Sequence, residues 1–543
     1  MARCVFFMLK TLNYSHHILN WMSIHDQNTI DETAVADDAR SIELWLATAR
    51  AVVAKNAPEE EKMSYEFFPN PITDPGVAAD RSRSAERPPV TGRLTLEQLR
   101  DAVSEGGIDT VIVAMTDMQG RLIGKRLTAR FFLDGNVSPQ LFCDYFLATD
   151  MEMTLVPGYA SASWERGYGD FALVPDMSTL RAVPWLPKTA IVLSDVTTSA
   201  GVSLEHSPRQ VLRRQLKRLA DLGFAADMAA ELEFYLFNQS YEDARTAKYE
   251  NLKFSSWYPE DGHIFQTSKD EPYVRAIRNL MERADIPVEG SKAECSPGQQ
   301  EINLQYAEAL ETCDRLALYK NGCKEIAHQM GKSVSFMAKL GETLSGNSCH
   351  IHLSLRNVET GAAGFYDQSR EGGMSELFRQ FLAGAIKHAP AATYFYAPNI
   401  NSYKRFTAGT FAPTRLAWSV DNRTTAFRVL GNGKSLRFEC RLPGADANPY
   451  LAFAALIASG LQGVEEKLSL ENAYAGNAYE ADDVPRIPGA LYRSLDRLEA
   501  SSVLRIAFGQ DVVGHYLHCG RWELGAFEGA VTDWEKTRLF ERC

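Results

Sequence analysis

The sequence lacks several features that would assign it to familiar protein classes. Its nine cysteines form no CxxC pair and their number is odd, which disfavours a disulfide framework or a cysteine-ligated zinc site. No apolar run approaches the roughly 18 residues that a membrane-spanning helix needs. A net charge of −12 disfavours a nucleic-acid-binding protein, which usually presents a basic face. We therefore expect a cytoplasmic protein that binds neither membranes nor nucleic acids.

The chain is long enough for more than one domain, at 543 residues. Residues 57–89 are rich in Glu, Pro, Asp, Arg and Ser, a composition typical of a linker. We interpret residues 1–94 as an N-terminal extension and linker that is disordered in part. Residues 95–200 are expected to form a small α+β domain, and residues 201–543 a large mixed α+β domain.

Local signals predict the first elements of both domains. Thr95 precedes LEQLRDAVSEGG, which has the capping residue and spacing of a helix. The apolar runs Thr110–Met115 and Leu122–Leu127 predict two strands joined by a turn at MQGR. Ser207 opens SPRQVLRRQLKRLADLGF, whose capping chemistry and spacing predict a second helix.

Four further segments alternate polar and apolar residues with the period of two that half-buried strands show: MAAELEFYLF, QQEINLQY, SCHIHLSL and LRFECRL. Any one of them alone is most simply an antiparallel strand with a solvated polar face. Solvated faces favour Lys, Thr and Ser, however, whereas these faces carry mainly carboxylates, imidazoles and guanidiniums.

Two carboxylates on one face of a strand repel each other unless a cation lies between them. With one glutamate just upstream of the second strand, five carboxylates and one imidazole form the set: Glu231, Glu233, Glu294, Glu301, Glu439 and His350. Such a set suits two or three Mg²⁺ or Mn²⁺ ions, which prefer oxygen ligands. The pattern therefore predicts a site for hard divalent metal ions.

Cationic residues are dense in the segments around and including the fourth strand: Arg405, Arg423, Arg428, Lys434, Arg437 and Arg441. Isolated arginines are usually surface residues or ion-pair partners. Their density beside a carboxylate cluster favours a site that holds a polyphosphate during phosphoryl transfer. The chain has no GxxxxGK[ST] loop, so a nucleotide would bind on another scaffold. The residues alone predict a metal- and phosphate-handling enzyme.

The motifs ELEFYLF, KAECSPGQQEINL, SGNSCHIHLSL, NSYKRF and LRFECRLPGADANPYLA occur in this order. They resemble the motifs of the glutamine synthetase superfamily, from about Leu96 to the C-terminus. The resemblance implies an α+β protein with an N-terminal β-grasp domain and a large catalytic domain whose antiparallel sheet lines the active site. It also implies a homo-oligomer, a dodecamer-like double ring in which neighbouring subunits share each active site.

The resemblance further implies that the protein uses L-glutamate, ATP and two or three Mg²⁺ or Mn²⁺ ions per site. The metal that orders glutamate would be held by Glu233, Glu294 and Glu301. The metal that bridges the ATP phosphates would be held by Glu231, His350 and Glu439.

Substrate contacts are implied in the same way. Contacts to glutamate and its amine partner are expected from Glu294, Gly346, Arg405, Phe411 and Arg441. Contacts to ATP are expected from Glu289, His352, Ser354, Arg428, Lys434 and Arg437. Catalytic roles, in neutralising the transferring phosphate or handling the amine, are expected from Arg405, Arg423 and Asp170.

Two departures from the family pattern concern the amine. Ammonia-using members carry a glutamate, in the loop after NSYKR, that takes a proton from ammonium; here the loop reads FTAGTFAP and Phe411 stands in its place. The first acidic position of the β-grasp loop falls in VPGYASASW, which has no acidic residue, although Asp170 matches the second. Beside Gly346, Ser345 replaces the usual asparagine.

We therefore expect an ATP-dependent ligase that joins the γ-carboxylate of L-glutamate to a polyamine, ethanolamine or an alkylamine through γ-glutamyl phosphate. Two alternatives stay open: an ordinary ammonia-using glutamine synthetase, and a non-catalytic relative with a structural or regulatory role. A guanidino kinase would lack the β-grasp domain and the Glu-x-Glu strand. Tyr479 falls near a position that some bacterial members adenylylate, but its flanking residues differ, so we do not expect that control.

Overall fold

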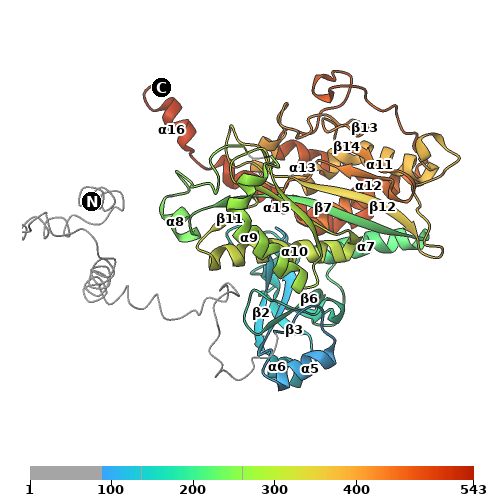
Figure 1. The fold of residues 1–543 in the computed structure, drawn as a ribbon. Coiled ribbons are helices and arrows are strands. Elements are labelled where there is room, and N and C mark those ends of the chain that lie inside the picture. The colour runs from blue at the N-terminus through green and yellow to red at the C-terminus, as the bar shows by residue number, and fades with distance from the viewer. Residues whose placement is uncertain (1–88, 136, 260) are drawn as a thin grey trace, which may run out of the picture. The chain divides into compact units, whose positions relative to one another are not determined.

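The computed structural model describes residues 89–135, 137–259 and 261–543. Residues 1–88 of the extension predicted over residues 1–94 lie outside this part. The described residues belong to one compact unit that contains a six-stranded and a nine-stranded sheet, which Figure 1 shows with their helices. Within the described residues, no helix is both long and apolar enough to cross a membrane.

The six-stranded sheet forms the N-terminal part of the unit. Its strand order is β2 (Leu122–Thr128), β1 (Thr110–Thr116), β6 (Thr189–Thr198), β4 (Asp170–Pro175) and β3 (Gln140–Cys143), with β5 (Arg181–Ala182) also paired to β6. The β1–β6 pair is parallel, and the other pairs are antiparallel. The two strands predicted near 110–115 and 122–127 are confirmed. The β-grasp assignment and the boundaries at 95 and 200 stay predictions.

Both predicted helices are present, with one difference in their caps. Helix α5 (Leu96–Ser104) begins with a capping box, in which the Gln98 amide donates to Thr95 Oγ1 over 3.1 Å and the Thr95 amide donates to Gln98 Oε1 over 2.8 Å. Helix α7 (Pro208–Asp221) follows Ser207, whose side chain makes no capping hydrogen bond. The expected cap is wrong because Pro208 at the first helical position has no N–H and a φ already suited to the helix.

The nine-stranded sheet contains all four strands predicted from alternation. Its order is β13 (Trp418–Val420), β14 (Phe427–Leu430), β15 (Arg437–Cys440), β12 (Cys349–Asn357), β7 (Phe224–Phe237), β9 (Gln299–Leu304) and β8 (Val288–Ala293), while β10 (Ala307–Glu308) and β11 (Ser333–Ser335) also pair with β7. Strands β15, β12, β7 and β9 are consecutive neighbours and antiparallel. The four predicted strands therefore form the centre of one antiparallel sheet.

The larger region also contains nine α-helices among the described residues: α8 (Tyr241–Thr246), α9 (Ile264–Arg283), α10 (Ala309–Gln329), α11 (Glu376–Tyr396), α12 (Pro449–Glu465), α13 (Leu491–Glu499), α14 (Ser502–Phe508), α15 (Gln510–Glu528) and α16 (Asp533–Leu539). The short helix α6 (Ala129–Asp134) follows β2 of the N-terminal sheet. Helices α11 and α12 approach very closely at Gly384 and Gly463. A Cβ on either glycine would lie 2.6 Å from the Cα of the other, so any larger residue would push the two helices apart.

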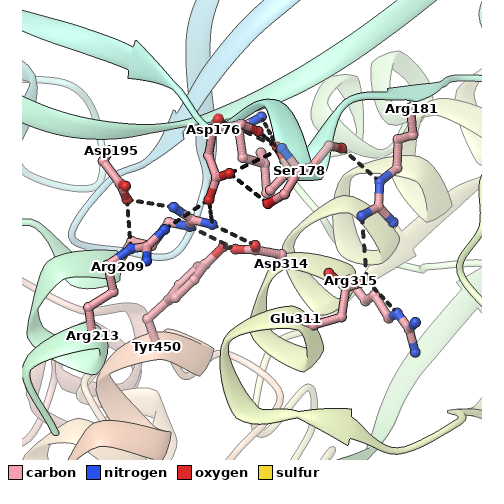
Figure 2. Close-up of polar contacts among 12 residues, drawn as sticks. Asp176, Ser178, Arg181, Asp195, Arg209, Arg213, Glu311, Asp314, Arg315 and Tyr450 are labelled. Atoms are coloured by element: carbon pink, nitrogen blue, oxygen red, sulfur yellow. Dashed lines mark hydrogen bonds and ion pairs between the residues drawn. The ribbon is translucent and has the colours of Figure 1, made fainter. Parts of the chain in front are cut away.

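A buried network of charges connects the N-terminal sheet with the larger region (Figure 2). Arg209 of α7 donates two hydrogen bonds to the Asp314 carboxylate of α10, over 3.0 and 2.9 Å. It also bonds Asp176 over 2.8 Å and Asp195, which belong to the six-stranded sheet region. The Tyr450 hydroxyl donates to Asp314 over 2.6 Å. Because Arg209 and Asp314 are both buried, each charge depends on the other.

We expect Arg209→Ala to lower the free energy of unfolding by about 3–5 kcal/mol, because it leaves the Asp314 carboxylate buried without its counter-charge. Lys217→Ala on the same helix is the control: the ion pair of Lys217 with Asp221 is largely exposed, so its loss should change stability by less than about 1 kcal/mol. Denaturant unfolding followed by circular dichroism measures both. Equal losses would contradict a structural role for this network.

Candidate active site

The register of the four central strands brings the predicted residues to one face of the sheet. Residues directly opposite each other in an antiparallel ladder project to the same side. The opposed pairs are Glu233 with Glu301, Glu231 with His350, and Glu439 with His352. A cavity of about 420 Å³ opens above the first two pairs. Sheet register thus positions the central residues of the site.

The structure brings the residues of the first predicted metal-ligand set close together. Carboxylate oxygens of Glu233, Glu294 and Glu301 all lie within 4.8 Å of one another. Glu233 and Glu301 come from β7 and β9, while Glu294 directly follows β8. Ser348 supports Glu233 through its amide, which donates over 2.8 Å, and through its hydroxyl. The three side chains therefore converge on one point from three strands.

Burial and like charges in this set favour a bound cation. Burial and the neighbouring charges of Glu233, Glu231 and Glu294 raise the pKa of Glu301 to about 9. The pKa of Glu233 is also raised, chiefly by burial. Lys292 Nζ bonds one member of the set, Glu294, and no other lysine or arginine of the described residues forms an ion pair with the set. Three converging carboxylates suit Mg²⁺ or Mn²⁺.

The second set contains a histidine that we had expected to contact ATP. Ligand atoms of Glu231, His352 and Glu439 lie within 4.8 Å of one another. The predicted ligand His350 is also adjacent, with Nδ1 3.3 Å from Glu231 and 3.2 Å from Glu439. Burial alone would raise the pKa of Glu231, but hydrogen bonds and charge from His350 and His352 hold it well below its usual range. Either imidazole can complete this set.

Buried arginines border the same cavity. Arg405 is 2% exposed and donates to the carbonyls of Leu442, over 2.9 Å, and Arg441, over 3.0 Å. No carboxylate of the described residues forms an ion pair with it, and burial lowers its pKa to about 10. Gly346 allows this packing, since a Cβ there would lie 2.6 Å from Arg405 Cγ. A buried guanidinium without a counter-charge favours an anionic ligand.

Arg441 and Arg428 approach the second metal set. Arg441 bonds Glu439, and its Nη2 donates to the Phe411 carbonyl over 3.2 Å. Its buried Nε has no hydrogen-bond partner among the described residues, so one donor remains for a ligand. Arg428 Nη1 bonds Glu439 over 3.2 Å. Arg423 is exposed and lines the cavity.

A second cavity, of about 510 Å³, contains five of the six residues expected to contact ATP: Glu289, His352, Ser354, Lys434 and Arg437. Glu289 lies in a β-bulge, because the β8–β9 pairing shifts register between Val288 and Gly290. Bulges redirect side chains beside functional sites. Arg428, the sixth residue, lines the first cavity. Glu231 lines both cavities, so the two spaces meet at a predicted metal ligand.

Comparison with known proteins agrees with this geometry. Residues 205–539 match the family described as glutamine synthetase, catalytic domain. The chain belongs to the glutamine synthetase family. The solved GmaS–ADP complex superposes with a TM-score of 0.72 at 27% identity, covering 81% of this chain and 99% of that one. The predicted mixed helix-and-sheet fold of this family is thereby confirmed.

Two curated members of the glutamine synthetase family resemble the chain over nearly their whole length. The gamma-glutamylethanolamide synthetase of Streptomyces coelicolor is 50% identical over 459 residues, or 84% of this chain and 97% of that one. The glutamate–isopropylamine ligase of a Pseudomonas species is 35% identical over 453 residues, or 82% of this chain and 97% of that one. Both names describe ligases of glutamate with an amine.

One predicted residue lies apart from the others, and several residues that line the first cavity were not predicted. Asp170 is exposed at the start of β4 and lines neither of the two cavities. Asp261, Lys292 and Cys295 line the first cavity but were not predicted. Lys292 lies two residues before Glu294. Residues at this spacing share one face of a strand, so the spacing could have identified Lys292 as a residue of the site. No periodic pattern includes Asp261, which lies in a loop.

We expect Glu301→Gln to weaken Mn²⁺ binding by about tenfold or more, about 1.4 kcal/mol, because it removes one of three converging carboxylates. Isothermal titration calorimetry with Mn²⁺ alone measures the affinity. Glu523→Gln is the matched control, since burial and nearby acidic residues raise the pKa of Glu523 as well, yet it lies outside the first cavity. Unchanged Mn²⁺ affinity in Glu301→Gln would contradict the assignment.

Proposed function

We propose that the protein is an ATP-dependent ligase that joins the γ-carboxylate of L-glutamate to a primary amine larger than ammonia. The observation that carries this proposal is the presence of Phe411 in the wall of the cavity that also contains Glu294 and Arg405. Carboxylates suited to metal ions and a guanidinium suited to a carboxylate line the same cavity, while the loop offers an aromatic ring instead of an acid. The names of the two relatives, which specify ethanolamide and isopropylamine, support the same class of amine.

In this proposal the first cavity would bind glutamate and the second would bind ATP. Arg405 and Arg441 would hold the glutamate carboxylate, and Arg423 and Arg428 would neutralise the transferring phosphoryl group. ATP would occupy the second cavity, with its phosphates directed to the junction at Glu231. Mg²⁺ or Mn²⁺, held by the two ligand sets, would neutralise phosphate charge and polarise the γ-phosphoryl group.

The reaction would run in two steps. A γ-carboxylate oxygen of glutamate attacks the γ-phosphorus of ATP; the new O–P bond forms, and the bond to ADP breaks with its electron pair leaving on ADP. The amine, after losing one proton to become neutral, attacks the γ-carbon. The C–N bond forms, the C–O bond to phosphate breaks with its electron pair, and the nitrogen loses a second proton. Activation is needed because a free carboxylate has no good leaving group.

The Phe411 ring favours an amine with a carbon skeleton over ammonia. It is 55% exposed, so part of its surface is available to a substrate in the cavity. An alkyl or hydroxyalkyl group packed there would remove apolar surface from water, at about 25 cal/mol per Å². Ammonia has no such group. An ordinary glutamine synthetase remains the second candidate, whereas a non-catalytic role is not favoured, because all six predicted metal ligands are retained.

We further propose a cytoplasmic homo-oligomer, a dodecamer-like double ring with shared active sites, that uses two or three metal ions per site. The position of Asp170 supports a shared site. It lies outside both cavities of its own chain on an exposed strand end, where it could serve a neighbouring subunit.

Purified protein with ATP, Mg²⁺ and L-glutamate should release phosphate faster with ethanolamine, isopropylamine, putrescine or spermidine than with ammonia, because only the larger amines can pack against Phe411. Phosphate release across this panel, with mass spectrometry of the amide, is the measurement. Equal kcat/KM for ammonia and the best amine would favour the ordinary glutamine synthetase instead.

Phe411→Ala should lower kcat/KM for isopropylamine about tenfold, about 1.4 kcal/mol, through lost apolar contact, and should leave the KM for ATP unchanged. Phe131→Ala provides the control, because Phe131 is similarly exposed at 61% but lies on α6, away from the cavity. If both variants retained wild-type kcat/KM, Phe411 would have no part in amine selection.

A further inference from the structure

The loop before α9 contributes a carboxylate to the entrance of the first cavity. Asp261 lies in this loop, and its amide donates to the Glu294 carbonyl over 3.2 Å. This bond joins the loop to the end of β8. The Asp261 side chain lines the cavity together with Glu294 and Phe411, and its carboxylate lies within 4.8 Å of a Glu294 oxygen.

Asp261 is the one carboxylate lining this cavity that belongs to neither predicted metal set. The other four are Glu231, Glu233, Glu294 and Glu301. Among the described residues, no side chain or amide donates a hydrogen bond to the Asp261 carboxylate. Its one ion pair there is a loose contact of 3.9 Å with Lys292 Nζ. It is therefore available to a second cation.

Lys292 shows that a primary ammonium group fits at this position. Its Nζ donates to Glu294 Oε1 while it lies at ion-pair distance from Asp261. Because Lys292 forms its hydrogen bond with Glu294, the Asp261 carboxylate is neutralised only in part. The Asp261 carboxylate thus presents residual negative charge to the cavity that it lines.

The proposed substrates need such a position. Primary alkylamines have pKa values near that of a lysine side chain, about 10, so at neutral pH they arrive as ammonium ions. Neither Phe411 nor the arginines of the cavity can bind a cation by an ion pair. A carboxylate beside an apolar ring provides one charged and one apolar contact, which together fix the orientation of an alkylammonium ion.

We propose that Asp261 binds the ammonium group of the amine substrate and so determines amine affinity. This inference rests on the proposed function and adds the residue that recognises the charged end of the substrate. The carbon skeleton of the amine then lies toward Phe411, and its nitrogen lies near Glu294. Asp261 is a binding residue here; proton loss from the nitrogen follows in the reaction itself.

Asp261→Asn tests the proposal, because it removes the charge and retains the shape. The KM for isopropylamine and for ethanolamine should rise about tenfold or more, while the KM values for ATP and glutamate stay unchanged. Hydroxylamine is the key comparison, because it is a smaller nitrogen nucleophile that is largely neutral at pH 7.5 and so does not need a carboxylate to bind its charge. Formation of γ-glutamyl hydroxamate by Asp261→Asn should therefore proceed at the wild-type rate.

Two further variants make the result specific. Asp261→Glu keeps the negative charge and should recover most of the affinity for isopropylamine. Asp243→Asn neutralises an exposed aspartate of α8 outside the cavity and should leave every KM unchanged. Thermal unfolding of each variant checks that the fold is intact.

The outcomes separate this inference from the proposed function. An unchanged isopropylamine KM in Asp261→Asn, or an equal loss with hydroxylamine, would overturn the role of Asp261 while the ligase activity stands. Wild-type protein that releases phosphate with neither hydroxylamine nor any alkylamine would overturn the proposed function, and this inference with it.

Discussion

The antiparallel register of β7 and β9 places two acidic side chains directly opposite each other, and the rest of the site depends on this constraint. Glu233 and Glu301 occupy opposed positions, where two negative charges oppose strand pairing. The apolar side of the same strands compensates, since Leu232 and Ile302 are fully buried. Apolar packing on one face of the sheet thus compensates for the repulsion between the carboxylates on the other face.

The two carboxylate sets resolve the same electrostatic problem in opposite ways. Around Glu231 and Glu439, imidazoles and guanidiniums supply positive charge, and the pKa of each carboxyl is lowered despite burial. Around Glu233 and Glu301, burial and like charges prevail, and the pKa of each is raised. Protein partners therefore favour the ionised form of the set around Glu231 and Glu439. An external cation would stabilise the ionised form of the set around Glu233 and Glu301.

Much of this arrangement follows from sequence period. Alternation located the strands and assigned residues such as Glu233 to the polar face, because side-chain direction in a strand depends on position alone. The order of strands in the sheet does not follow from alternation, since pairing between distant segments depends on tertiary packing. Alternation therefore places His350 and His352 on one face of β12 without saying which of them approaches Glu231 and Glu439. Their position relative to Glu231 and Glu439 is a property of register.

The alternation of polar and apolar residues does not predict which loop residues enter a cavity or which charged residues form buried ion pairs. Asp261 enters the cavity because its loop closes onto β8, a contact between distant parts of the chain. Arg209 follows a predicted helix start and is most simply read as part of a solvated face. In the structure it is buried against Asp314. For charged residues, sequence alone rarely distinguishes a solvated position from a paired one, because the partner is specified only by the fold.

The shared wall at Glu231 has a thermodynamic consequence for the two cavities. A side chain that borders both spaces cannot adapt to a ligand on one side without altering the surface offered to the other. Occupancy of the two spaces is then linked by a single coupling free energy. Linkage is reciprocal, so the factor by which one ligand changes the affinity of the second equals the factor by which the second changes the affinity of the first. The coupling through Glu231 would therefore be the same whichever substrate binds first, and the order of binding would be set by the rates of association.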